Sequence, residues 1–338
     1  MKIVWASTCH GYLRYLYPLL ILMLCISMTW SFGFTTTTTK TSIIGNYIHT
    51  PPTTSKSCTY SNRQESTRLL KSLQDQDEVD VNDVETNQLF SNVGMVLLAG
   101  GTGSRMKANL PKQFLTLAGM PVLHHSLTLF LEKLPFPKVA LVLDPLYHAD
   151  YQCWLDRYPD RLVLANPGKE RQDSVQQGLD AIVKEDVDNN FQYVAIHDSA
   201  RPLVTLSEIV HVIQDAKKYG AAVLGVPCKA TIKEVDSSKT SNRVVQTLNR
   251  SRLWEIQTPQ VIEIPKLIRG FAHVRENNLD VTDDGSVVEA LGEMVQVTLG
   301  EYTNLKLTTP EDMDVAELIL SKRRANEKQQ VETMVTHA

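Results

Sequence analysis

Short aliphatic runs alternate with segments of helical periodicity along most of this chain, and this alternation constrains the fold more than any other feature. The aliphatic runs occupy residues 93–98, 139–143, 162–164, 193–196 and 221–226. Unbroken runs of this kind are typical of parallel strands that are buried on both faces. The segments with apolar residues at helical spacing occupy residues 122–131, 174–183, 207–219, 281–291 and 310–320. Strands that alternate with helices predict an α/β fold with a doubly wound, mostly parallel sheet.

One region breaks the alternation and predicts a β-hairpin arm. Two segments of strand-like composition, residues 230–235 and 243–248, flank a polar, turn-rich stretch at residues 236–242. Two such segments joined by a polar turn are expected to pair as a hairpin. We therefore predict an arm, at about residues 228–254, that projects from the sheet.

The composition excludes several classes of protein. The 338 residues carry 34 Lys and Arg against 38 Asp and Glu, which gives a net charge of −4. No global positive field therefore favours nucleic acid or an anionic membrane as the partner, and an anionic ligand must be met by local charge. The cysteines lack the spacing of metal ligands and stand at Cys9, Cys25, Cys58, Cys153 and Cys228. Neither a zinc site nor a disulfide framework is indicated.

The N-terminal region has the composition of a targeting sequence. No Asp or Glu occurs between Met1 and Gln64. A short apolar run at residues 16–28 is followed by small residues around Gly33, which predicts a signal peptide-like segment at residues 1–33. The run is shorter than a typical transmembrane helix. A signal anchor that holds the protein in an endomembrane is the alternative interpretation.

Hydroxyl-rich sequence follows the apolar run. It opens with Phe34 and a tract of threonines and continues through Thr67, a composition typical of organellar transit peptides. Residues 74–85 are acidic and lack a helical stripe, which indicates a solvated linker. We expect the transit peptide and linker at residues 34–90, the main folded domain at residues 91–323 and a C-terminal tail at residues 324–338.

A glycine-rich loop follows the first aliphatic run and predicts a phosphate-binding site. The sequence from Ala99 to Met106 reads Ala-Gly-Gly-Thr-Gly-Ser-Arg-Met. Glycines such as Gly100 and Gly103 let backbone N–H groups approach an anion closely. No Gly-Lys-Ser/Thr follows at the spacing of a P-loop, and Met106 stands where a dinucleotide-binding loop needs its third glycine. Two common nucleotide-binding motifs are therefore excluded.

Two cations accompany this loop. Arg105 lies within it, and Lys112 follows Pro111 shortly afterwards. The whole pattern, A-G-G-x-G-x-R-M followed by P-K-Q, resembles nucleotidyltransferases that join a sugar or polyol phosphate to a nucleoside triphosphate. Attack on the α-phosphorus needs neutralisation of charge on the phosphate oxygens more than it needs a base. We therefore predict that Arg105 and Lys112 stabilise the transition state; two solvated surface cations are the alternative.

Further polar segments follow other aliphatic runs, at the strand ends where open α/β sheets bind ligands. Gly168 permits close approach of a ligand and Ser174 offers a hydroxyl, with helix capping as the alternative. Asp198 places a carboxylate where Mg²⁺ that bridges a triphosphate would lie. The alternative for Asp198 is an N-cap or a salt bridge to Arg201, and the adjacent His197 is expected to be structural.

The remaining candidates lie on the arm and beyond it. Arg250 is a cation on the arm, which suggests that it reaches a neighbouring site. Thr282 and Asp283 begin a predicted helix, where capping by Thr282 and the acidic N-terminal residues is a strong alternative. Lys306 is expected on a strand before a helix, and taken alone it would be a solvated lysine.

In order along the chain, these segments resemble the 2-C-methyl-D-erythritol 4-phosphate cytidylyltransferase family over about residues 93–321. Besides the glycine-rich loop, the resemblance rests on PGKERQDSV, IHDSARPLV, GVPCKATIKEV, LWEIQTPQVI and TDDGSVVE, and it is closest to plant-type members. The family implies a Rossmann-like fold of the nucleotidyltransferase type. It also implies transfer of CMP from CTP to methylerythritol phosphate in isoprenoid precursor synthesis, Mg²⁺ or another divalent cation as the cofactor, and a homodimer in which each arm completes the partner's site.

The resemblance also implies roles for particular residues. Arg105 and Lys112 match the transition-state stabilisers, and Arg250 and Lys306 match the pair that positions the methylerythritol phosphate. Neighbours of that substrate site are matched by Arg201, Thr231, Thr258, Thr282 and Asp283. The nucleotide pocket is matched by Ala99, Gly100, Gly103, Gly168 and Ser174, with Asp198 beside the ribose, the phosphates and Mg²⁺.

The sequence departs from the family pattern at a few positions. Several bacterial relatives have an acid at the position of Lys169 and a second basic residue at that of Ser104, so no contact with the base is assigned to Lys169. Gly285 stands where a larger residue is usual, which weakens the start of that helix.

Two alternative functions remain at this point. A ribitol-phosphate or other polyol-phosphate cytidylyltransferase would share the loop and the reaction, and a non-catalytic nucleotide-binding protein would share the scaffold. The N-terminal region resembles the bipartite presequences of plastids enclosed by extra membranes. It therefore predicts a location in the plastid (chloroplast) stroma, reached through the secretory route, with no stable membrane association after processing.

Overall fold

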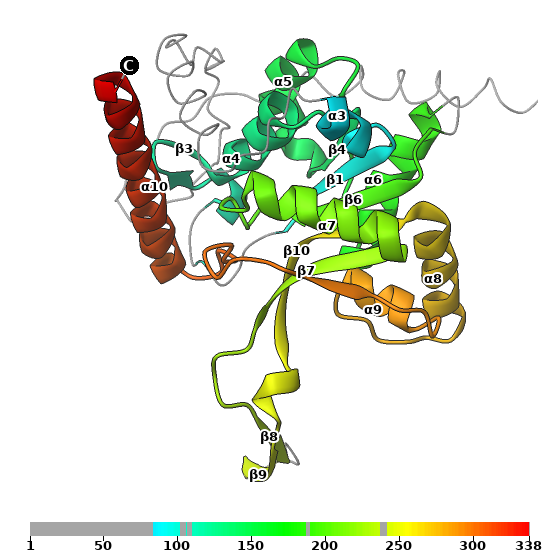
Figure 1. The fold of residues 1–338 in the computed structure, drawn as a ribbon. Coiled ribbons are helices and arrows are strands. Elements are labelled where there is room, and N and C mark those ends of the chain that lie inside the picture. Colours follow the sequence, from blue (N-terminus) through cyan, green and yellow to red (C-terminus); the bar gives the residue numbers. More distant parts are fainter. Residues whose placement is uncertain (1–83, 102–105, 107–109, 187–189, 237–241, 338) are drawn as a thin grey trace, which may run out of the picture. The chain divides into compact units, whose positions relative to one another are not determined.

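The computed structural model describes residues 84–101, 106, 110–186, 190–236 and 242–337 (Figure 1). These residues all belong to one compact unit, which spans Cys58–Ala338. The predicted signal peptide-like segment, most of the transit peptide and linker, and the loop residues Gly103 and Arg105 lie outside the described residues. Within the part of the chain that is described, no helix is both long enough and apolar enough to cross a membrane.

A seven-stranded sheet forms the centre of the described residues. Its strand order is β11-β7-β10-β6-β1-β4-β5. β10 runs antiparallel to both of its neighbours, and the other pairs are parallel, which confirms the prediction of a mostly parallel sheet. The strands are β1 (Val93–Leu98), β4 (Lys138–Val142), β5 (Leu162–Ala165), β6 (Tyr193–Asp198), β7 (Ala221–Pro227), β10 (Trp254–Glu263) and β11 (Gln296–Leu299).

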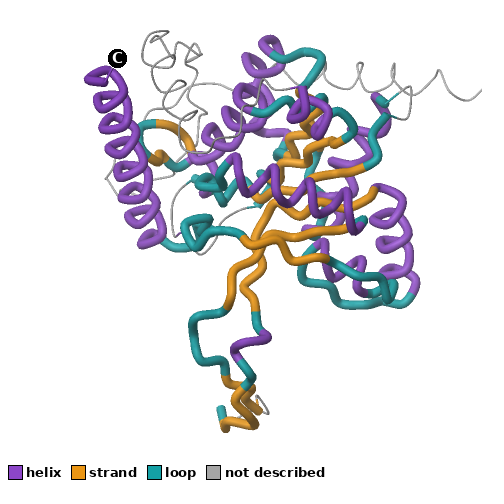
Figure 2. Tube along the Cα trace, viewed as in Figure 1, coloured by secondary structure: helices purple, strands orange, loops and turns teal. Residues whose placement is uncertain are grey.

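Helices cover both faces of the sheet (Figures 1 and 2), as a doubly wound fold requires. Successive residues of β1 face opposite ways, so that Met95 and Leu97 lie in one core and Val96 lies in the other. The first core also contains side chains of α3 (Val84–Phe90), α4 (Val122–Thr128) and α7 (Leu206–Tyr219). The second contains side chains of α6 (Arg171–Glu185), α8 (Ile264–Glu276) and α9 (Asp284–Glu289).

Smaller elements complete the body. The 3-10 helix η2 (Lys112–Phe114) follows the glycine-rich loop, and a π-helical turn, η3 (Leu129–Lys133), extends α4. The long helix α10 (Pro310–His337) contributes to a third apolar cluster with Leu203 and Leu307. The others are β2 (Thr116–Leu117), β3 (Met120–Pro121), η4 (Pro145–Tyr151), α5 (Gln152–Arg157) and η5 (Arg250–Arg252).

The order of the strands creates a crevice beside β1. The chain passes from β1 to β4 and β5 on one side, and then crosses to the other side of β1 to form β6. The connection after β1 leads toward β4, and the connection after β6 leads the opposite way along the sheet, toward β7. Ligands of open α/β sheets bind at such a switch point, beyond the carboxyl ends of the strands.

The predicted hairpin arm is present. β8 (Lys233–Asp236) pairs antiparallel with β9 (Arg243–Thr247), and every residue of both strands is exposed. Figure 1 shows this pair at the end of an arm that projects away from the central sheet.

Some elements differ from the sequence-based expectations. The strands β10 and β11 and the helix α8 were not predicted, and α9 is shorter than the predicted helix at residues 281–291 because Asp283 caps it. Lys306 does not lie on a strand, because residues 300–309 contain neither helix nor strand. α10 continues from the predicted helix into the predicted tail.

The helix α3 lies at the end of the segment that we predicted as transit peptide and linker. Its Phe90 is fully buried and packs edge-on against Phe136, with ring centroids 4.8 Å apart. The folded body therefore includes residues from Val84 onward.

Phe90→Ala tests this assignment. Large-to-small changes of a buried Phe cost about 3–5 kcal/mol because they leave a cavity, and we expect a loss of that size in the free energy of unfolding, measured with urea. Val84→Ala, at an exposed position of the same helix, is the control and should cost less than about 0.5 kcal/mol. Equal, small losses in both variants would show that α3 does not belong to the core.

Candidate active site

A cavity of about 270 Å³ lies at the carboxyl ends of the strands, at the switch point beside β1. Three connections line it: the loop after β1, the loop from β5 to α6, and the residues that follow β6. Lys112 and Lys306 line it as well, although Lys306 comes from a distant part of the sequence. Of the residues predicted for the nucleotide pocket, the cavity is lined by Ala99, Gly100, Gly168, Ser174 and Asp198.

Two glycines allow the loops around the cavity to pack closely. A Cβ at Gly100 would lie 2.6 Å from Cβ of Pro167, so a side chain there would push the two loops apart. A Cβ at Gly168 would overlap Asp173 at the start of α6. The side-chain amide of Gln113 donates to the backbone oxygen of Ala99 (2.6 Å) and so restrains the start of the loop after β1. The cavity is therefore shaped by close backbone contacts.

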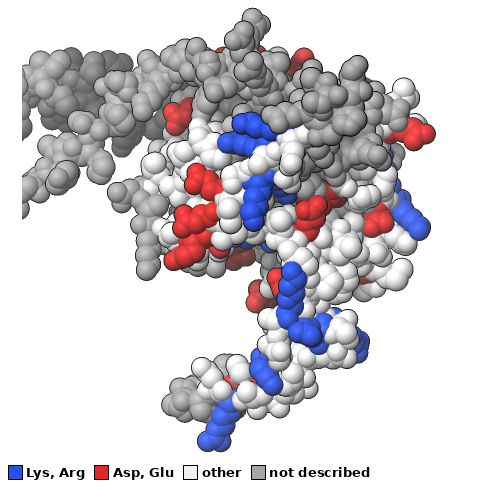
Figure 3. Space-filling view, turned by 60° about the vertical axis from the view of Figure 1, so that its left-hand side comes forward, with Lys and Arg blue, Asp and Glu red and all other residues white. Residues whose placement is uncertain are grey.

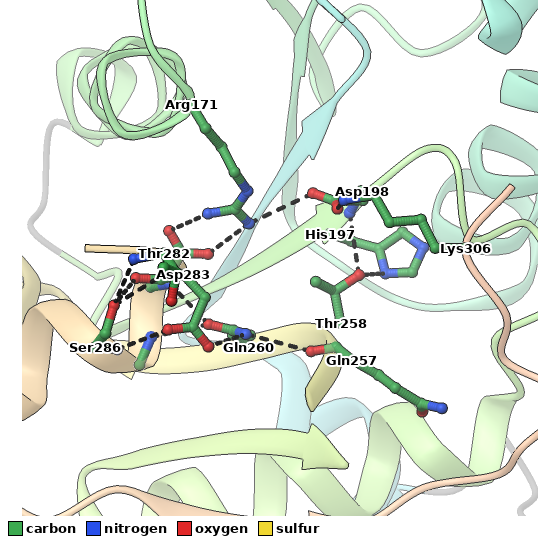
Figure 4. A network of polar contacts seen from close by, with 12 residues as sticks. Arg171, His197, Asp198, Gln257, Thr258, Gln260, Thr282, Asp283, Ser286 and Lys306 are labelled. Atoms are coloured by element: carbon green, nitrogen blue, oxygen red, sulfur yellow. Dashed lines mark hydrogen bonds and ion pairs between the residues drawn. The ribbon is translucent and has the colours of Figure 1, made fainter. Parts of the chain in front are cut away.

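Asp198, at the end of β6, is held between two cations (Figure 4). The ammonium group of Lys306 lies 2.5 Å from Oδ2, and the guanidinium of Arg171 lies 3.4 Å from Oδ1. Burial alone would raise the pKa of Asp198, but the charges of Arg171 and Lys306 outweigh burial and hold the pKa well below its usual range. The carboxylate is therefore ionised at neutral pH.

Arg171 connects this carboxylate to a second one. Its guanidinium makes two hydrogen bonds of 2.8 Å to the two carboxylate oxygens of Asp284, the first residue of α9. Asp284 is almost fully buried, and paired hydrogen bonds of this kind fix the plane of the guanidinium. The start of α6 and the start of α9 are thus joined beside Asp198.

A chain of hydrogen bonds positions the backbone of Asp198. Its N–H donates to the hydroxyl of Thr258, and the Thr258 hydroxyl in turn lies 3.0 Å from Nδ1 of His197. Nε2 of His197 lies 3.1 Å from the backbone oxygen of Arg201, which can only accept, so Nε2 carries the proton and Nδ1 accepts from Thr258. Both functions of the Thr258 hydroxyl are used within the protein, which makes Thr258 part of the support of Asp198.

Other predicted residues also use their polar groups internally. The hydroxyl of Ser174 accepts from the N–H of Gly168 and donates to the backbone oxygen of Glu170. Asp283 caps α9 by accepting from the N–H of Ser286, whereas Thr282 is exposed and is not the cap. Capping was the alternative for this segment, and the structure supports it with Asp283 in place of Thr282.

The cavity has an excess of positive charge. Its lining contains four basic side chains, Lys112, Lys169, Arg171 and Lys306, against two acidic ones, Glu170 and Asp198. The N-terminus of the 15-residue helix α6 adds a partial positive charge at the same place. This local field is what an anionic ligand requires in a chain whose net charge is −4.

The predicted substrate-site residues are not all brought together in one chain. Arg250 lines a separate cavity of about 460 Å³ at the base of the arm and donates to the backbone oxygen of Lys229 (2.9 Å). Thr231 is exposed on the arm. Arg201 donates to the backbone oxygen of Asn304 and to that of Ile256 on β10, so its hydrogen bonds support the backbone. The ion-pair partners of Asp198 are Arg171 and Lys306.

Comparison with known proteins identifies the family. The family model for 2-C-methyl-D-erythritol 4-phosphate cytidylyltransferase matches residues 93–322. The chloroplastic protein of that name from Oryza sativa subsp. japonica is 47% identical over 238 residues, which are 70% of this chain and 75% of the relative. The protein of that name from Bacillus velezensis is 40% identical over 235 residues, 69% of this chain and 97% of the relative. The chain belongs to this family.

Solved structures agree with this assignment. The cytidylyltransferase of the same name from Francisella tularensis has a TM-score of 0.56 and 30% identity, over 68% of this chain and 99% of that one. The 4-diphosphocytidyl-2C-methyl-D-erythritol synthase from Anaerococcus prevotii has a TM-score of 0.58 and 25% identity, over 68% and 98%. The predicted fold and family are therefore confirmed, while the roles of individual residues stay predictions.

The sequence-based analysis of this cytidylyltransferase-family chain missed several residues that build the site. Arg171 was quoted within a motif but was given no role, and its partner Asp284 was considered only as part of a helix start. A signal for Arg171 was available in the sequence: it follows Gly168 closely and begins a helix. The structure shows that this helix start lines the cavity. Gln113 offered no such signal, because its contact depends on how two loops meet.

The buried His197 makes stability depend on pH. Burial lowers its pKa to about 4, against the opposing effect of the Asp198 charge, while the unfolded chain has the ordinary value of 6.5. Between these values the unfolded state binds more protons, so stability is full above pH 6.5 and falls as the pH falls toward 4. In His197→Gln we expect this slope to decrease by about 1 kcal/mol per pH unit, measured by urea unfolding at several pH values.

His211→Gln, at an exposed position of α7, is the matched control and should keep the wild-type slope. The same slope in His197→Gln and wild type would contradict the assignment of a neutral, buried His197.

Proposed function

We propose that this protein transfers CMP from CTP to 2-C-methyl-D-erythritol 4-phosphate and releases pyrophosphate. The observation that carries the proposal is the cavity at the end of β1, where Lys112 and Lys306 meet beside the ionised Asp198 in a chain of this family. Two phosphorylated reactants repel each other, and such a site offsets their charge with fixed cations.

The nucleotide occupies the cavity between the loop after β1 and the N-terminus of α6. Gly100 and Gly168 line this cavity, and their lack of side chains lets the loops around it pack closely. In this proposal Lys112 and Arg105 neutralise the charge that develops on the oxygens of the α-phosphate.

Methylerythritol phosphate enters from the side of Lys306. Its phosphate oxygen attacks the α-phosphorus of CTP; a new P–O bond forms while the bond from the α-phosphorus to the bridging oxygen breaks, and the electron pair leaves with pyrophosphate. Lys306 supplies the positive charge that holds the attacking phosphate. The product is 4-CDP-2-C-methyl-D-erythritol.

Mg²⁺ fits this site as the accompanying cation. Among the described residues no group of three or more His, Cys, Asp or Glu side chains could hold a metal ion. Mg²⁺ commonly binds through one or two carboxylates together with the phosphates of the substrate, and Asp198 offers one ionised carboxylate. Bound there, Mg²⁺ would lower the charge of the triphosphate.

The arm of a second copy completes the site. Within one chain Arg250 lines a cavity apart from the one that contains Lys306, so a role for Arg250 at the reacting phosphate needs a partner. Exposed apolar side chains on the arm favour contact with another subunit: Ile232, Val235, Val244, Val245, Trp254 and Ile256. Figure 3 shows Lys and Arg side chains along the arm. We therefore propose a homodimer in which each arm reaches the partner's cavity.

The protein acts in the plastid stroma in this proposal. A chloroplastic protein from rice is among its relatives, and the N-terminal sequence is rich in hydroxyl residues and poor in acids. The order of an apolar run followed by a transit peptide-like segment supports passage through the secretory route.

An assay of pyrophosphate release tests the proposed reaction. The protein with CTP and Mg²⁺ should release pyrophosphate with methylerythritol phosphate, and Lys112→Ala should lower kcat by about 10²- to 10³-fold because a preorganised charge is removed. Lys184→Ala, exposed in the last turn of α6, is the control and should keep full activity. Release with ribitol phosphate alone would overturn the substrate, and release with neither alcohol phosphate would favour a non-catalytic protein.

Mixing two variants of strongly reduced activity tests the shared site. Arg250→Ala lacks the arm cation and Lys306→Ala lacks the body cation, so each homodimer has two incomplete sites. A mixed dimer has one site with both cations, and random pairing should restore about a quarter of wild-type activity. Activity that stays at the level of the separate variants would contradict a site completed by the partner's arm.

A further inference from the structure

Lys306 lies in a segment whose position does not come from regular secondary structure. Residues 300–309, between β11 and α10, contain neither helix nor strand. A side chain on such a segment is placed only as well as the segment is anchored. What anchors the backbone on each side of Lys306 therefore decides where its ammonium group lies.

On the C-terminal side, the adjacent Leu307 provides the anchor. Its side chain is fully buried in the third apolar cluster, and its N–H donates to the backbone oxygen of Ala200 (2.7 Å). Ala200 follows Asp198 by two residues, so this bond ties the segment to the end of β6. The backbone oxygen of Leu307 also accepts a hydrogen bond from Lys112 (3.3 Å), which ties Lys112 to the residue next to Lys306.

On the N-terminal side, the anchor is Asn304. Its side chain is completely buried, and its amide group donates to the backbone oxygen of Thr258 (3.0 Å) and to the side-chain oxygen of Gln257 (3.2 Å). Both partners can only accept, so the NH₂ group of Asn304 must face them. The backbone oxygen of Asn304 accepts from Arg201 (2.7 Å). Asn304 thus binds Thr258, which supports Asp198, and also binds Gln257 and Arg201.

Gln257 extends the same anchor. Its amide donates to the backbone oxygen of Glu301 (2.9 Å), and the N–H of Glu301 donates to the buried carboxylate of Glu208 on α7 (2.8 Å). These bonds fix the turn that leads into Asn304. They connect the segment to β10 and to α7, which are rigid elements of the sheet and its helical layer.

We propose that Asn304 is a positioning residue for Lys306. By pinning the segment to β10 it holds the ammonium group of Lys306 beside Asp198, where the attacking phosphate is bound. Asn304 touches neither substrate and acts through Lys306 alone. The proposal deepens the proposed function and depends on the role that it gives to Lys306.

Asn304→Ala tests the proposal through a difference between the two substrates. A misplaced Lys306 weakens the hold on methylerythritol phosphate, so we expect its KM to rise about 10- to 100-fold while the KM for CTP changes less than about twofold. In the Lys306→Ala background, Asn304→Ala should have no further effect on kcat/KM for methylerythritol phosphate, because the group that it positions is gone.

Thr298→Val is the matched control. The Thr298 hydroxyl is buried on β11 and donates to Asp215 (2.6 Å), so the variant loses a buried hydrogen bond of the same kind away from the cavity. Its Tm should fall and both KM values should stay unchanged. If Asn304→Ala does not fold, Gln257→Ala, which removes the bonds to Asn304 and Glu301, replaces it with the same readouts.

The outcomes separate the inference from the function. Equal rises in both KM values, or effects that add to those of Lys306→Ala, would overturn the positioning role. Wild-type kinetics in Asn304→Ala would overturn it as well and leave the proposed reaction intact. A wild-type protein that releases no pyrophosphate with CTP, Mg²⁺ and methylerythritol phosphate would instead contradict the proposed function.

Discussion

The ion pairs of Asp198 are the interaction on which the rest of the site depends. The carboxylate lies at the end of β6, next to β1, where the strand order reverses. It forms ion pairs with Arg171 from α6 and with Lys306 from the segment before α10. Asp198 itself is buried, so removing either cation would leave its charge only partly compensated. The three elements are therefore held together by a requirement of charge balance, and the cations gathered in this way line the cavity.

The surroundings of Asp198 are organised to keep that arrangement in one geometry. His197 and Thr258 fix its backbone by a chain of hydrogen bonds in which each donor has one acceptor, and Asp284 fixes the plane of Arg171. Buried polar networks are useful when they are well satisfied, because each bond then restrains the next. The cavity is thus preorganised before a ligand arrives, and preorganised charge is the main source of catalysis in phosphoryl transfer.

Much of the fold could be predicted from the sequence, and the reason is burial. β1 is covered on both faces, so it reads as an unbroken aliphatic run, and the hairpin arm reads as two short strands around a polar turn. β10 was missed because it carries Gln257, Thr258 and Gln260, whose polar side chains are satisfied mainly by tertiary contacts. The pairing of Arg171 with Asp284 joins residues 113 positions apart, which no local pattern encodes. The role of Lys112 was predicted from the glycine-rich loop pattern and its chemistry, and that of Lys306 came from family resemblance; the structure adds that the two side chains line one cavity.

A crystal structure of the protein with CTP and Mg²⁺ tests the central claim most directly. The account predicts that the triphosphate lies in the cavity beyond β1, with Lys112 in hydrogen-bond contact with it and the ion between the phosphates and Asp198. A nucleotide bound elsewhere, with Asp198 still enclosed by Arg171 and Lys306 and the cavity empty, would contradict the account.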